Sequence, residues 1–123
     1  MPTDTEDYKI AAGEVVLSVI VGDAGIGATQ VSMIDPLAHS TTPLQWEGAP
    51  GSPQGLSLGA GANLLGKMLL VTTRVRPNPS AVWTSFTAVL HGGAADQQWP
   101  QTPKVSSPGS GTVDFVFVAR FLP

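Results

Sequence analysis

Cysteine is absent from the chain, which excludes several kinds of structure and chemistry. Without thiols there is no disulfide framework, no thiolate zinc site and no cysteine nucleophile. Charge is scarce as well, since 12% of the residues are Asp, Glu, Lys or Arg, against about 25% in ordinary soluble domains. Nine acidic and six basic residues give a net charge of −3. With no basic patch, we expect neither nucleic acid nor an anionic membrane to be the main partner.

Helical periodicity is also missing. The segment 58–70 comes closest to an amphipathic helix, but glycines at positions 59, 61 and 66 argue against it. No apolar run approaches the roughly 18 residues that a membrane-spanning helix needs. The first nine residues are acidic, whereas a signal peptide begins with basic residues. We therefore expect a soluble cytoplasmic protein without a membrane span, although export by a route without a cleaved signal stays open.

The sequence is rich in β-strand patterns, and the clearest pair lies between Lys67 and Gly92. Apolar and polar residues alternate in both halves of this segment, as a strand with one buried face requires. The predicted buried positions are Leu69, Val71, Thr73 and Val75 in the first half, and Val82, Thr84, Phe86, Ala88 and Leu90 in the second. Pro77–Ser80 between them carries turn chemistry, because each proline fixes φ and removes a ladder donor. The pattern predicts an antiparallel β-hairpin.

Three further strands are indicated. Residues 14–21 are apolar on both faces and predict a central strand or one covered on both sides. A glycine-rich hairpin loop, 22–27, leads into a shorter strand over 28–34, which ends at Asp35-Pro36. The C-terminal strand, 112–122, has a regular apolar face composed of Val113, Phe115, Phe117, Ala119 and Phe121.

Two irregular regions, 37–65 and 93–111, are rich in glycine, proline and small polar residues. We expect one or two short strands in the first, which suits a Greek-key crossover or a binding loop. The sequence predicts an all-β fold, an antiparallel β-sandwich of the immunoglobulin-like or jelly-roll Greek-key type, with a small β-barrel as the alternative. Residues 1–13 are predicted to be a flexible N-terminal arm and residues 14–123 a single domain.

Each apparent catalytic motif lacks a residue or a spacing that its chemistry requires. Gly61–Met68 nearly matches a phosphate-binding loop, but Met68 replaces the hydroxyl that would bind magnesium and a β-pattern follows. We interpret this segment as a turn leading into a strand. His39 and His91 lie outside any metal-binding spacing, and no serine has a nucleophile-elbow setting. The sequence therefore predicts a protein that is not an enzyme and has no cofactor or metal.

The three tryptophans are the best candidates for contact residues. Trp46 and Trp99 are predicted to lie in loops among polar side chains, where Gln98 and Asp96 accompany Trp99. Aromatic rings beside planar polar groups suit sugars and protein interfaces alike. We favour the structural alternative, in which each loop tryptophan folds over the edge of the core and closes it. Trp83 lies in the predicted hairpin, on the face opposite Phe86.

The scarcity of charge favours a non-catalytic interaction or structural module that contacts copies of itself or a partner protein. No charged residue occurs between Gly48 and Gly66, or between Lys104 and Asp114. Interface cores are depleted in charge, so large uncharged surfaces suit burial in an assembly. The predicted contact surfaces are the 48–66 connection and the strand face bearing Trp83. The alternative function is a carbohydrate- or small-ligand-binding domain that uses Trp46 and Trp99.

Overall fold

The protein is a two-layered β-sandwich, which confirms the predicted all-β fold. The computed structural model describes residues 5–22, 24–46, 51–77, 83–101, 104–105 and 113–123; for residues 22, 24–27, 76, 77, 83, 104 and 105 it describes the backbone alone. The elements are β1 (Thr5–Lys9), β2 (Glu14–Gly22), β3 (Ala24–Asp35), β4 (Ser40–Pro43), β5 (Leu56–Ala60), the single 3₁₀ turn η1 (Gly61–Asn63), β6 (Met68–Pro77), β7 (Trp83–His91), β8 (Gln97–Pro100), β9 (Lys104–Val105) and β10 (Val113–Leu122).

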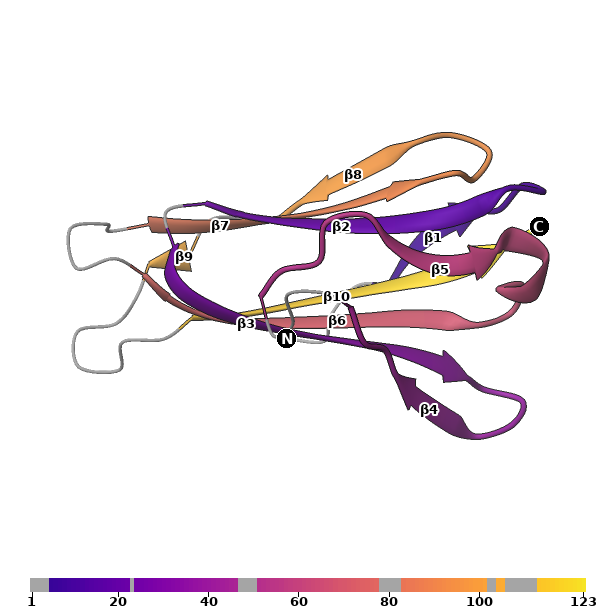
Figure 1. Ribbon diagram of the computed structural model, residues 1–123, viewed down its shortest axis with the longest axis horizontal. Coiled ribbons are helices and arrows are strands. Elements are labelled where there is room, and N and C mark those ends of the chain that lie inside the picture. Colours follow the sequence, from indigo (N-terminus) through magenta and orange to yellow (C-terminus); the bar gives the residue numbers. More distant parts are fainter. Residues whose placement is uncertain (1–4, 23, 47–50, 78–82, 102–103, 106–112) are drawn as a thin grey trace.

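The strands form two sheets. Sheet A has the order β1-β10-β6-β3-β4, and sheet B has the order β5-β2-β7-β8, with β9 also pairing with β7. Figure 1 shows the sheets as two packed layers, with β2 and β7 in one and β3, β6 and β10 in the other. All pairs are antiparallel except β1 with β10. Both sheets keep edge strands in the described part of the chain, so the barrel alternative does not apply.

The core lies between the two sheets and uses the predicted faces. Every described residue of the predicted apolar faces of β6, β7 and β10 is buried, and β2 adds Val15, Leu17 and Val19. Phe86 of sheet B stacks on Phe115 of sheet A with 5.4 Å between ring centroids. The alternation predicted these faces correctly because a period of two assigns each side chain to one side of a sheet.

The predicted pairing of β6 with β7 is wrong. β6 belongs to sheet A, between β10 and β3, whereas β7 belongs to sheet B, beside β2. The glycine-rich segment 22–27 is no hairpin loop either, because β2 and β3 also lie in different sheets. Alternation specifies which face a strand buries and leaves its neighbours undetermined. In the predicted turn Pro77–Ser80, residues 78–80 lie outside the described part of the chain.

The N-terminal segment also differs from the flexible arm predicted for residues 1–13. Thr5–Lys9 form β1 and pair with β10 in parallel, and Tyr8 is fully buried. The Tyr8 ring makes edge-to-face contacts with Trp99 and Phe121, at centroid distances of 5.9 and 6.3 Å. One aromatic side chain among polar ones is a weak strand signal, but burying it stabilises the strand by roughly 1.5–3 kcal/mol.

The two irregular regions contain the short strands β4, β5, β8 and β9, of which the first two fulfil the expectation for residues 37–65. β4 forms a hairpin with the end of β3, and β5 pairs with β2, so this connection passes from sheet A to sheet B. Residues 61–63 form the 3₁₀ turn η1 that leads to β6, which agrees with the turn-into-strand interpretation.

Candidate functional site

The outer face of sheet A has an apolar area where a solvent-facing sheet would ordinarily be polar. Alternate residues of three neighbouring strands point away from the core there. We define the apolar patch as the five half-buried side chains Ile34 of β3, Met68 and Leu70 of β6, and Val118 and Leu122 of β10. Strand register sets Leu70 beside Val118, and Met68 beside Ile34. Four of the five side chains therefore lie next to one another on β3, β6 and β10, whereas Leu122 is separated from Val118 by the outward-facing Arg120, which lies opposite Met68.

Two ion pairs lie on the same face: Arg120 of the first lies between Val118 and Leu122 of the patch, and the second lies beyond the patch. Arg120 Nη2 lies 2.8 Å from Asp7 Oδ1, linking β10 to β1. Arg74 binds Asp114 through both carboxylate oxygens, at 2.8 and 3.3 Å. The hydrogen bond to Asp114 raises the pKa of Arg74 above its usual value. These exposed pairs add little stability. Each combines a positive and a negative charge, so both signs occur on the face that bears the patch.

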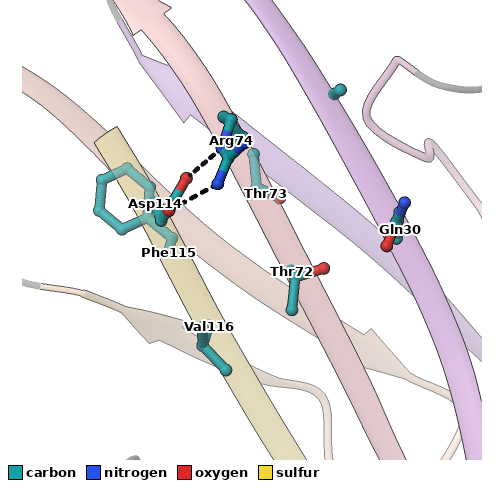
Figure 2. Close-up of a pocket in the computed structure, with 8 residues that line it drawn as sticks. Gln30, Thr72, Thr73, Arg74, Asp114, Phe115 and Val116 are labelled. Atoms are coloured by element: carbon teal, nitrogen blue, oxygen red, sulfur yellow. Dashed lines mark hydrogen bonds and ion pairs between the residues drawn. The ribbon is translucent and has the colours of Figure 1, made fainter. Parts of the chain in front are cut away.

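Beside the patch, the outer face is hollowed and polar. A depression of about 450 Å³, which we call the polar hollow, is lined by Ala28, Gln30, Thr72, Thr73, Arg74, Asp114, Phe115 and Val116. Figure 2 shows its labelled side chains on three strands, with the Arg74–Asp114 pair at one end and Gln30 across β6 from Val116. Hydrogen-bonding groups thus converge on a site that no single sequence motif marks.

A second hollow, of about 320 Å³, adjoins the edge of β3 and contains Trp46. The chain runs on beyond β4 along β3, since the Leu44 N–H donates to the Val31 carbonyl at 2.8 Å. The Trp46 ring packs against the core, and its Nε1–H donates to the Gly51 carbonyl at 2.8 Å. Gln30 lines both hollows, so together they follow one side of sheet A.

Trp99 lies in β8, not in the predicted loop. Its half-buried ring contacts Tyr8 and Phe117, the latter with 5.3 Å between centroids. This arrangement matches the alternative of a tryptophan that covers the edge of the core. Gln98 and Asp96 near it are exposed. Because Trp46 adjoins sheet A and Trp99 belongs to sheet B, the two rings do not line the same hollow.

Asp96 belongs to a small polar turn. Its carboxylate contacts His91 Nδ1 at 3.2 Å and accepts the Gly92 N–H at 3.3 Å. The bond with His91, and then the one with Gly92, lowers the pKa of Asp96. These contacts indicate that Asp96 stabilises the exposed turn between β7 and β8.

The two contact surfaces predicted from the sequence stay predictions. Ile20, on the outer face of sheet B, is 53% exposed, and Val16 and Ser18 beside it are half-buried. The side chain of Trp83 lies outside the description, as do residues 47–50 of the 48–66 connection. The patch on sheet A was not predicted, although its residues occur in the sequence between core positions of β6 and β10.

The rest of the described chain shows no other obvious site. Its only helical turn is far too short to cross a membrane. Within that same part, no three His, Asp or Glu side chains gather in an arrangement that could hold a metal ion. Searches against family models, curated proteins and solved structures found no match. The functional argument therefore depends on the outer faces of the sandwich.

Proposed function

We propose that this protein is a non-catalytic structural module that associates with copies of itself through the apolar patch on sheet A. The observation that carries the proposal is the group of outward aliphatic side chains on β3, β6 and β10, of which Ile34, Met68, Leu70 and Val118 are neighbours. Burying apolar surface yields roughly 25 cal/mol per Å². A second molecule that covers the patch would recover this free energy.

The charge on the outer face of sheet A favours a second copy of the protein as the partner that covers the patch. The two ion pairs on the face contribute two arginines and two aspartates, so they add no net charge. A strongly charged face would repel its own copy, whereas this one combines an apolar centre with both signs around it, as stable interfaces do. A two-fold axis would set each Arg–Asp pair near a pair of the same composition. Most soluble homo-oligomers close in this way.

NMR of the methyl groups on the two outer faces tests self-association directly. In a dilution series from about 500 to 10 μM, NMR signals of Ile34, Leu70 and Val118 should shift with concentration. The methyls of Ile20, on the outer face of sheet B, should not move, because that face remains in solvent in a closed dimer. Shifts confined to Ile20 would place the contact on the other sheet, and no shift anywhere would contradict self-association.

A further inference from the structure

The polar hollow exists because the long side chain of Arg74 turns away from it and the neighbouring side chains are short. On β3, Ala28 stands opposite Arg74 and offers only a methyl group. Arg74 turns instead toward Asp114 on the other side, where its Nε and Nη2 atoms are engaged. Thr72 in the next row is also short. The space between Ala28 and Thr72 is consequently left open. Figure 2 shows Arg74 turned toward Asp114 and away from Gln30.

The lining of this space combines apolar surface with hydrogen-bonding groups that carry almost no net charge. Gln30 offers an amide with both a donor and an acceptor side, and Thr72 offers a hydroxyl that can do either. Arg74 and Asp114 neutralise one another. An anion would therefore find no unbalanced positive charge, and an apolar ligand would have to cover hydrogen-bonding groups at a cost. A neutral ligand with many hydroxyl groups fits best.

A second hollow adjoins the first, with Gln30 in the lining of both. There Gln45 adds a second amide, and Trp46 adds the part of its indole that does not pack against the core. A linear chain of sugar rings could follow these two hollows. Its hydroxyl groups would form hydrogen bonds with Gln30 and Gln45, and one ring face would lie against Trp46. The larger hollow alone, at about 450 Å³, falls within the usual range for ligand sites, roughly 300–1,000 Å³.

From this geometry we infer that the polar hollow, with the adjoining hollow at Trp46, is a binding site for a neutral linear oligosaccharide. The site moves the carbohydrate alternative away from Trp99, Gln98 and Asp96 to a different sheet. It shares no residue with the apolar patch, but Thr72 and Val116 directly adjoin Leu70 and Val118 on the same strands. A second copy that covers the patch would therefore compete with the ligand for this face of sheet A.

Four soluble probes test the inference: cellohexaose, xylohexaose, maltohexaose and chitohexaose. Saturable binding of at least one is expected, measured by calorimetry and by Trp fluorescence. Ala28→Tyr fills the hollow from an exposed position and should weaken binding at least tenfold. Gln30→Ala removes the shared amide and should weaken it severalfold. The matched control, Ala38→Tyr, places the same ring on the exposed turn between β3 and β4 and should bind like the wild type.

Two outcomes would overturn the inference. One is that none of the four probes binds at millimolar concentration. The other is that a probe binds equally well to the wild type and to Ala28→Tyr. Leu70→Lys, which should disrupt self-association, separates the two proposals, because it is expected to leave oligosaccharide affinity at least as high as in the wild type. Loss of affinity in Leu70→Lys would mean that the ligand occupies the patch instead of the hollow.

Discussion

The phenol oxygen of Tyr8 accepts a hydrogen bond from the backbone N–H of Gly93 at 2.8 Å, joining residues 85 positions apart. The contact depends on the absence of a side chain at position 93. A Cβ added there would lie 2.4 Å from the Lys9 carbonyl oxygen and 2.5 Å from the Tyr8 ring. The N-terminal strand is therefore docked in a space that glycine provides between the two sheets.

Gly93→Ala should destabilise the protein by about 1–3 kcal/mol, the usual cost of overpacking a tight site. Gly13→Ala is the matched control, because its nearest neighbour would be the Gly92 oxygen at an ordinary 3.6 Å. Urea unfolding of both variants measures the difference. Equal stability in the two variants would show that β1 does not occupy this space.

The titration of Tyr8 should be visible without interference, since it is the only tyrosine in the chain. Burial raises its pKa, an effect partly opposed by the Gly93 hydrogen bond. The phenolate absorbance near 295 nm should therefore appear with a midpoint above pH 10 in the folded protein. A midpoint at or below the value of the urea-unfolded chain would contradict the buried position.

The same pKa shift makes stability depend on pH in the alkaline range. The folded protein keeps the Tyr8 proton at a pH where the unfolded chain loses it, so the contribution is complete below the unfolded pKa and is lost as pH rises through the folded pKa. Tyr8→Phe should remove this part of the alkaline loss. At pH 7 the variant should be about 1–3 kcal/mol less stable, because the buried Gly93 N–H loses its partner.

Neighbouring residues of β10 should respond very differently to truncation. Phe117 is 2% exposed, so Phe117→Ala should cost roughly 3–5 kcal/mol. Val118 points to the opposite face, and Val118→Ala should cost under about 1 kcal/mol when measured at low micromolar concentration. Denaturant unfolding compares the pair. A larger loss at Val118 would mean that the faces of β10 are reversed.

A buried hydroxyl pair offers another test. Thr29 and Thr73 are almost fully buried, and their Oγ1 atoms lie 2.9 Å apart. Thr73→Val should cost about 1–3 kcal/mol by leaving Thr29 with a poorer partner, Ser52 at 3.4 Å. The double variant Thr29→Val/Thr73→Val should recover part of that loss. Additive costs in thermal or urea unfolding would argue against direct coupling of the two hydroxyls.

The fold class and the buried faces were predictable because alternation is a local property. Phe115 and Phe117 could be assigned to one face from their spacing alone. The partner of each strand was not predictable, since pairing β6 with β3 and β10 depends on contacts far apart in the chain. Tyr8 was missed for a similar reason: a single aromatic in a short polar segment gives no periodic signal.

The candidate site depends still more on long-range register. Leu70 and Val118 are ordinary strand residues in sequence, and they form a patch only because β6 and β10 pair with those positions side by side. The polar hollow likewise needs Ala28 opposite Arg74. Trp99 stood out in the sequence by its type and neighbours, but its ring is occupied by contacts with Tyr8 and Phe117.

Sedimentation velocity across a concentration series tests the central claim of self-association through sheet A. The wild type should show a concentration-dependent shift from a 12.7 kDa monomer to a closed oligomer. Leu70→Lys should weaken association at least tenfold, since its ammonium would lose hydration in the interface. Ile20→Lys introduces the same charge on the exposed face of sheet B and should associate like the wild type. A wild type that stays monomeric at several hundred micromolar, or dissociation by Ile20→Lys with no effect of Leu70→Lys, would contradict the account.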